Sequence, residues 1–290
     1  MTAYWGILIL RALLRTIPEP VGRALGSRAG QAAYFLDFRH RRIALKNLAG
    51  ALGRETTPAQ RRRIARLSFG FLGESLFRLL QADKFLAGTW RERFRLHGLA
   101  HLEKAREEGR GIIFVLAHLD AWEYLALIPR LLNFRGAAVA QEIKNPALDG
   151  LLRDIREKMG LEIFGKHEVA SALLDFLAGG GAIAILADQR AREMSVTVPF
   201  FNQPASTTAA PALLAARSGA ALIPVFIESS GRDFSVTFLP EVESANRGGV
   251  GNRVKAVTAV ITLIIEKQIR KNPERWLWAH RRWKPAEAGG

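Results

Sequence analysis

The chain contains no cysteine, although it is 290 residues long. This absence excludes disulfide bonds, cysteine-based zinc sites and a thiol nucleophile, and it fits a reducing compartment. HExxH and G-x-S-x-G motifs are also missing, so we predict no metal site and no serine elbow. The segment Gly160–His167 lacks the Ser or Thr of a phosphate loop, and Gly179–Gly181 precedes an expected strand instead of following one.

Long apolar runs are scarce. The N-terminal run over residues 3–14 is interrupted by Arg11 and is shorter than the ~20 residues of a membrane-spanning helix. No small-residue cleavage site follows it, so we do not expect a signal peptide. We predict that residues 1–17 form an interfacial membrane helix, with Arg11 and Arg15 on anionic phosphates. The alternative is an ordinary first core helix.

Acidic residues are few relative to basic ones: 27 Asp and Glu stand against 42 Lys and Arg, for a net charge of +15. This excess attracts nucleic acid, an anionic membrane or an acidic or phosphorylated partner. The basic residues are spread along the chain without a known nucleic-acid motif, which makes nucleic-acid binding the distant alternative. The aromatic and basic segment 276–284 suits a headgroup interface or single-stranded nucleic acid, or else a buried terminal strand.

The pattern of apolar residues divides the chain into two regions. Residues 18–90 read as a helical N-terminal cap with helices at Glu19–Gln31, Leu36–Leu52 and Pro58–Gln81. Within 91–290, short apolar runs alternate with helices, which predicts an α/β fold with a central, largely parallel sheet flanked by helices. Strands are expected at 111–117, 137–140, 182–187 and 221–228, with 233–239 as an antiparallel addition. Helices are expected near 121–132, 146–159, 167–178, 208–217 and 252–271. We see no repeat or linker and expect one compact unit.

The strongest chemical signal follows the first expected strand. His118 lies directly after 111–117, and open α/β sheets bind ligands beyond the carboxyl ends of their strands. Its near-neutral pKa suits removal of a proton from a hydroxyl. A loop at 118–120 would let the Glu123 carboxylate bond the imidazole and fix its tautomer. The alternative is a capping box, with Asp120 as N-cap, Glu123 at the third position and His118 a buried core residue.

The segment from His118 to Glu123 resembles the H-x4-[DE] motif of glycerolipid acyltransferases. With Trp122 before Glu123, it is similar to the late acyltransferases of lipid A biosynthesis. Further motifs in the same order resemble that family over most of the chain: Asn47 in LKNL, Asn145-Pro-Ala-Leu-Asp149 with Arg156, Asp188-Gln189, Pro199 to Thr208, and Trp276-Leu-Trp278-Ala-His280-Arg281-Arg282. The chain departs from the family pattern at Asp120-Ala121, Ala140 to Glu142 and Asn202, which puts the acceptor more in doubt than the reaction.

This resemblance implies an O-acyltransferase at the cytoplasmic face of the bacterial inner membrane. The donor would be an acyl carrier protein thioester, whose phosphopantetheine belongs to the carrier, so no cofactor of the enzyme is expected. The acceptor would be a lipid A precursor, or alternatively a lysophospholipid, an aminolipid or a mannosylated phospholipid. His118 would act as general base, held by Glu123. Arg156 would stabilise the oxyanion or bind a phosphate, unless it is a solvated helix residue. The acidic carrier suits a basic enzyme.

Weaker candidates surround these residues. Asp188 is expected at the same sheet edge as His118, where it would orient Arg156 or bind a sugar hydroxyl, or else pair locally in a turn. Gln189 follows it. Thr207 and Thr208 are expected to open a helix, either receiving a phosphate or only capping the helix. The pair at 200–201 is expected in the core more than in an acyl channel.

Overall fold

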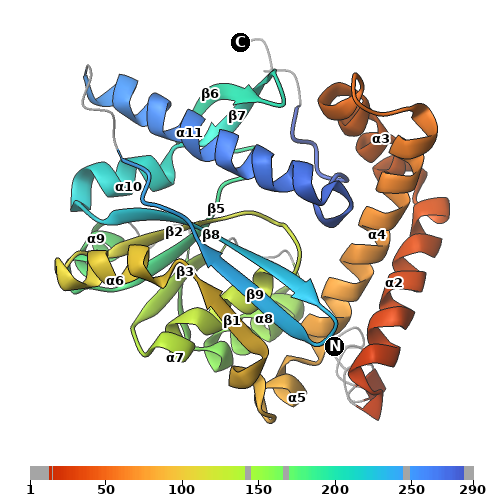
Figure 1. The fold of residues 1–290 in the computed structure, drawn as a ribbon, viewed down its shortest axis with the longest axis horizontal. Helices are drawn as coiled ribbons and strands as arrows, with labels where there is room; N and C mark the ends of the chain where they lie inside the picture. Colours follow the sequence, from red (N-terminus) through yellow and green to blue (C-terminus); the bar gives the residue numbers. More distant parts are fainter. Residues whose placement is uncertain (1–12, 15, 141–144, 166–169, 244–248, 284–290) are drawn as a thin grey trace.

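The computed structural model describes residues 13–14, 16–140, 145–165, 170–243 and 249–283. Its centre is a seven-stranded sheet with the strand order β1-β9-β8-β2-β5-β3-β4 (Figure 1). The expected interfacial helix at 1–17 lies almost entirely outside the described residues. Among the described residues, no helix is long and apolar enough to cross a membrane.

The strands confirm an α/β fold with a mostly parallel sheet. Their bounds are β1 Phe94–His97, β2 Ile112–Leu116, β3 Gly136–Ala140, β4 Leu161–Gly165, β5 Ala182–Leu186, β8 Ala221–Ser230 and β9 Asp233–Phe238. β9 pairs antiparallel with β8, as expected, and β1 then pairs parallel with β9. Sequence patterns missed both edge strands, β1 and β4, because a strand at the edge lacks the continuous apolar run of a central one.

Most helices lie close to their predicted positions, but those at 82–86 and 99–107 were not predicted. They are α2 Glu19–Leu36, α3 Phe38–Leu52, α4 Pro58–Leu80, α5 Ala82–Leu86, α6 Leu99–Glu107, α7 Ile128–Leu132, α8 Pro146–Met159, α9 Ala170–Ala178, α10 Ala210–Ser218 and α11 Val250–Lys271. α4 begins with the predicted Thr57 cap, whose side chain and Gln60 form a capping box. The helix expected near 121–132 instead opens as a 3-10 helix, η2, at Trp122–Leu127.

Strand β2 separates two hydrophobic cores. Successive side chains of a strand point to opposite faces of the sheet. Ile113 and Val115 therefore join the core beneath α9, α10, α11 and the N-terminal helices, whereas Ile112 and Phe114 join the core beneath α5, α6 and α8. All five residues of β2 are buried. Because both faces of β2 are covered by other elements, its sequence is an unbroken apolar run.

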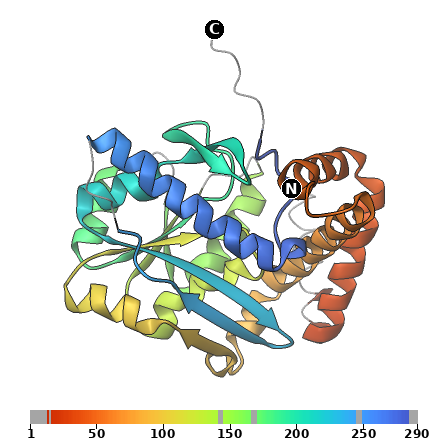
Figure 2. The same ribbon diagram turned by 45° about the horizontal axis from the view of Figure 1, so that its top comes forward.

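Helices α2, α3 and α4 stand together beside the sheet, and two views show α2 running along α4 (Figures 1 and 2). Glycines allow the close approach. A Cβ at Gly73 of α4 would overlap the carbonyl oxygen of Gly26, and one at Gly30 of α2 would overlap the carbonyl oxygen of Phe69. The two helices therefore pack backbone against backbone, with no room for side chains at these crossing points.

The C-terminal segment is part of the core. Trp276 and Trp278 are 1% and 0% exposed and pack edge to face against each other. Trp276 also packs on Phe200, and Trp278 on Phe201. The prediction that Trp276 and Trp278 lie at a membrane headgroup interface is therefore wrong, and the expectation that residues 200–201 belong to the core is confirmed. Residues 195–208 form a hairpin that was not predicted, β6 Ser195–Phe200 with β7 Gln203–Thr208.

The glycine contact between α2 and α4 can be tested by adding one methyl group. Gly73→Ala should lower the free energy of unfolding by about 1–3 kcal/mol, because the helices must separate to admit the Cβ. Gly150→Ala in α8 is the matched control, because nothing lies within 4 Å of its Cβ position. That change should stabilise the protein by up to about 1 kcal/mol. Urea unfolding followed by circular dichroism measures both, and equal effects would contradict the packing described.

Candidate active site

The sheet register brings His118 and Asp188 together. β2 and β5 are parallel neighbours in which Leu116 is paired with Leu186. Two residues beyond each paired position, the chains leave the sheet at the same edge as His118 and Asp188. The imidazole and the carboxylate therefore lie beyond the carboxyl ends of the strands, where α/β sheets bind ligands.

The carboxylate of Asp188 holds His118 at two points. Its Oδ1 lies 2.8 Å from His118 Nδ1, and its Oδ2 accepts from the backbone N–H of His118 at 3.0 Å. The indole of Trp276 donates a third bond to Oδ2 at 2.8 Å. With Nδ1–H bonded to a carboxylate, the neutral imidazole keeps its lone pair on Nε2. The geometry thus sets up Nε2 as a proton acceptor, as in other carboxylate–histidine pairs.

Burial and charge shift both pKa values of this pair. Burial lowers the pKa of His118, but the charge of Asp188 and its hydrogen bond outweigh burial and raise the pKa above its ordinary 6.5. Burial raises the pKa of Asp188, but the charge of His118 and hydrogen bonds from His118 and Trp276 outweigh it and bring the pKa down to about 2. The carboxylate is therefore ionised at neutral pH and stabilises the protonated imidazole.

Glu123 has a different partner from the one predicted. Its carboxylate binds the guanidinium of Arg156 on α8, with Nη2 to Oε1 at 2.9 Å and Nε to Oε2 at 3.3 Å. Among the described residues it makes no hydrogen bond to His118, so the expectation that Glu123 holds the imidazole is corrected: Asp188 does so. The Glu123–Arg156 pair is nevertheless close, because the charges of both residues act on the pKa of His118.

The alternative interpretation, in which Asp120 is the N-cap of a capping box, is also wrong. Asp120 has a φ of 52° and is 2% exposed. Its carboxylate accepts from the hydroxyl of Ser229 at 2.6 Å and from the backbone N–H of Ser229 at 3.1 Å, and it pairs with Arg275. Ala121 is the N-cap of η2, without a side-chain cap. Asp120 therefore ties the loop after His118 to β8 and to the C-terminal segment.

The remaining candidates lie at the border of the site. Thr207 and Thr208 end β7 and do not open α10, whose N-cap is Ala209. Thr207 is 0% exposed, and its hydroxyl accepts from Arg282 at 2.6 Å. Thr208 accepts from the backbone N–H of Ala210 at 3.2 Å, which is a capping contact. The prediction that Thr207 and Thr208 open a helix is therefore wrong. Gln189 is half-buried directly after Asp188.

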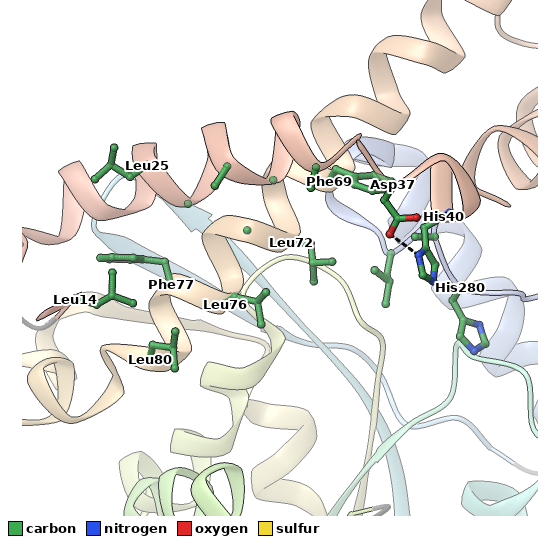
Figure 3. A pocket seen from close by; sticks show the side chains of 17 residues that line it. Leu14, Leu25, Asp37, His40, Phe69, Leu72, Leu76, Phe77, Leu80 and His280 are labelled. Atoms are coloured by element: carbon green, nitrogen blue, oxygen red, sulfur yellow. Dashed lines mark hydrogen bonds and ion pairs between the residues drawn. The ribbon is translucent and has the colours of Figure 1, made fainter. Parts of the chain in front are cut away.

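An apolar groove of about 790 Å³ runs along α2 and α4 and includes His280 of the C-terminal segment (Figure 3). Leu14, Leu25 and Leu80 lie toward one end, and His40 and His280 lie at the other. The volume is typical of a small-molecule site. The groove offers hydrocarbon contacts along most of its length and polar groups at one end only.

His280 connects the groove to the His118–Asp188 pair, and its importance was not recognised in the sequence. Asn47 of α3 donates to the carbonyl oxygen of His280 at 2.7 Å and to that of Trp278 at 2.8 Å. His280 Nδ1 is buried and has no hydrogen-bond partner among the described residues. Burial lowers the pKa of His280, and the charges of Asp188 and His118 also act on it. A neutral imidazole thus lies at the polar end of the groove, near enough to His118 and Asp188 for their charges to act on it.

Comparison with known proteins defines the family. The family model for bacterial lipid A biosynthesis acyltransferases matches residues 1–285. The chain therefore belongs to this family, a class of acyl-transferring enzymes. No group of three or more His, Asp or Glu side chains that could hold a metal ion occurs in the part of the chain that the structure describes.

The names of individual relatives give different acyl groups and different lipids. The chain is 28% identical to a lipid A biosynthesis palmitoleoyltransferase of Escherichia coli K12, over 94% of this chain and 88% of the relative. It is 26% identical to the lauroyltransferase of the same organism, over 99% and 94%. It is also 26% identical to a phosphatidylinositol mannoside acyltransferase of Mycobacterium tuberculosis, over 67% of this chain and 66% of that relative, just under two thirds of its length.

The effect of Asp188 on His118 can be measured without substrate. In Asp188→Asn the titration midpoint of His118 should fall below that of the wild type, because the charge that raises the pKa is gone while burial remains. Nuclear magnetic resonance of labelled histidine side chains follows the midpoint. Asp233→Asn, which removes a half-exposed carboxylate elsewhere, should leave it unchanged. An unchanged midpoint in Asp188→Asn would contradict the assigned pairing.

Proposed function

We propose that the protein transfers a fatty acyl chain from an acyl carrier protein thioester to a hydroxyl of a lipid A precursor at the cytoplasmic face of the inner membrane. The observation that carries this proposal is the buried Asp188 carboxylate on His118 Nδ1 beside an apolar groove, in a chain that belongs to the lipid A acyltransferase family. The pair supplies a base for a hydroxyl, and the groove supplies a site for a hydrocarbon chain.

The reaction would proceed through proton transfer at His118. Nε2 accepts the proton of the acceptor hydroxyl while the oxygen attacks the thioester carbonyl carbon. The resulting imidazolium is stabilised by Asp188, whose pKa near 2 keeps it ionised throughout. Collapse of the tetrahedral intermediate breaks the carbon–sulfur bond, and the imidazolium returns the proton to the departing thiolate. His118 is thereby regenerated and no other reactant is consumed.

Arg156 is proposed to stabilise negative charge in this reaction, and Glu123 is proposed to position it. The two bonds to Glu123 use Nε and Nη2, and among the described residues Nη1 has no hydrogen-bond partner. A guanidinium carries five N–H donors in a planar array, so donors remain for an oxyanion or an acceptor phosphate. In this proposal Glu123 of the H-x4-E motif acts by positioning Arg156, although it does not bond the imidazole.

The groove along α2 and α4 is proposed to hold the acyl chain. Its walls are mainly Leu, Ala, Gly and Phe side chains, and its polar end adjoins the His118–Asp188 pair through His280. A chain lying in the groove would place its thioester at that end.

A second acceptor is favoured by one relative, which is named for phosphatidylinositol mannoside. Acyl transfer to a mannosylated phospholipid would use the same base and the same groove. The departure from the family pattern at Asp120-Ala121 directly follows His118 and Leu119 and bears on this choice. A lysophospholipid or an aminolipid would also fit this chemistry.

Removing the base should abolish the reaction. Purified protein, acyl carrier protein thioester and tetra-acylated lipid A precursor should give a mass gain of one acyl chain. His118→Ala should reduce the rate by about 10²–10⁴-fold or more, as expected for loss of a general base. Glu123→Ala should also reduce it strongly, by freeing Arg156. Near-normal rates in either folded variant would refute the mechanism, and a mass gain only on another lipid of a mixed extract would change the acceptor.

Narrowing the groove should change the preferred acyl chain. Leu72→Trp places an indole in the groove wall and should lower kcat/KM for a long-chain thioester by roughly tenfold, with a small effect on a short chain. Leu263→Trp is the matched control, because Leu263 is 50% exposed on α11, outside the groove. Equal effects on long and short chains in Leu72→Trp would argue against the groove as the acyl site.

A further inference from the structure

The corner between α2 and α3 carries an unusual group of exposed apolar side chains. Phe35, Leu36 and Phe38 are 55%, 78% and 67% exposed, among the largest exposures of apolar residues in the described part of the chain. They surround Asp37, which ends α2 and caps α3 by accepting from the backbone N–H of His40. The corner is therefore rigidly formed, although its apolar side chains contact little of the protein.

A basic cleft adjoins this corner between α3 and α4. It has a volume of about 570 Å³ and is lined by four arginines, Arg41, Arg62, Arg63 and Arg66, together with Tyr34 and Phe35. No carboxylate contributes to its lining. Among the described residues none of these guanidinium groups forms an ion pair, whereas arginines elsewhere, such as Arg110 and Arg270, bind carboxylates. The Arg41 guanidinium lies over the aromatic rings of Tyr34 and Phe38.

The corner also stands beside the apolar groove. Ala33, Asp37 and His40 line the groove, whereas Phe35 and Arg41, from the same short segment, line the basic cleft. One side of the corner thus offers a site for hydrocarbon, and the other offers unpaired positive charge. A lipid has these two parts, and apolar side chains that protrude next to cations are typical of proteins that insert at a membrane interface.

We propose that the α2–α3 corner is the membrane-docking surface of this protein, with Phe35, Leu36 and Phe38 inserted among the acyl chains of an anionic phospholipid bilayer and the arginine cleft holding a lipid phosphate. This proposal rests on the membrane location in the proposed function, and not on its chemistry. It places the groove next to the bilayer, so that a lipid can enter from the side. An acidic carrier protein would satisfy the arginines, but it would not account for side chains that protrude as far as Leu36.

The absence of cysteine permits a direct test in the full chain. Phe38→Cys labelled with an environment-sensitive dye should brighten and shift to the blue when phosphatidylglycerol vesicles are added. Arg95→Cys is the control, because its side chain is 75% exposed on β1, far from the corner in sequence. That position should not respond. Vesicle binding without a response at position 38 would overturn the proposal and would assign membrane contact to another segment.

The cleft is tested by a charge-matched pair of variants. Arg62→Gln/Arg63→Gln/Arg66→Gln should weaken binding to phosphatidylglycerol vesicles by roughly tenfold or more, with little effect on phosphatidylcholine vesicles. Arg95→Gln/Arg135→Gln/Arg153→Gln removes the same charge from arginines that have carboxylate partners, and should cost far less. Equal losses of vesicle affinity in the two variants would contradict the proposal that the cleft binds a lipid headgroup.

Two further measurements separate this proposal from its rival and from the proposed reaction. If the cleft variant lost affinity for acyl carrier protein and kept its affinity for vesicles, the cleft would be a protein-docking site and the proposal would be wrong. On substrates dispersed in detergent, both arginine variants should retain wild-type transfer rates, because they leave His118 and Asp188 intact. Vesicle binding is read without turnover, so failure of the acyl-transfer hypothesis would not affect this result.

Discussion

The buried carboxylate of Asp188 is the interaction on which the site depends. Burying an ionised carboxylate costs free energy unless its charge is compensated and its oxygens are hydrogen-bonded. Here the backbone and imidazole of His118 and the indole of Trp276 all bind it. These groups come from the end of β2 and from the C-terminal segment, so one charge joins two sheet strands and the chain terminus. Loss of any partner would leave the carboxylate under-bonded in the core.

Hydrogen bonds from the N-terminal helices hold the C-terminal segment that carries Trp276. Asn47 of α3 bonds the carbonyl oxygens of Trp278 and His280, and Ser68 of α4 donates to that of Trp276 at 2.6 Å. The irregular backbone after α11 therefore obtains hydrogen bonds from helices that are distant in sequence. The same helices form the apolar groove, so the elements that hold the indole on Asp188 also shape the space for a hydrocarbon chain.

Two ion pairs, His118–Asp188 and Glu123–Arg156, have different effects at the site. Asp188 acts on the imidazole itself, whereas Glu123 binds Arg156 and so fixes the direction of a guanidinium beside the imidazole. Both carboxylates favour the protonated form of His118, and Arg156 opposes it. The site thus contains a base that gains a proton readily and a cation able to meet a developing negative charge. These are the two requirements of acyl transfer to a hydroxyl.

Much of this organisation can be predicted from the sequence. Continuous apolar runs located the central strands, because strands covered on both faces have no polar side to show. The position of His118 and Asp188 after neighbouring strands placed both at one sheet edge, and the ordered motifs indicated the family. The tertiary structure alone decided which carboxylate binds which cation. The resemblance to the H-x4-[DE] motif assigned Glu123 to His118, but the register of β2 with β5 puts Asp188 there and leaves Glu123 to Arg156 of α8.

The same distinction explains the terminal tryptophans. Trp276 and Trp278 stand in a basic, aromatic segment whose composition fits a membrane interface as well as a core. Composition cannot choose between them, because burial depends on which surfaces meet in three dimensions. In the fold the indoles pack on Phe200 and Phe201 from an unpredicted hairpin, whereas three strongly exposed apolar side chains cluster at the α2–α3 corner. The sequence determined the elements and the chemistry available, and long-range packing determined which residues meet.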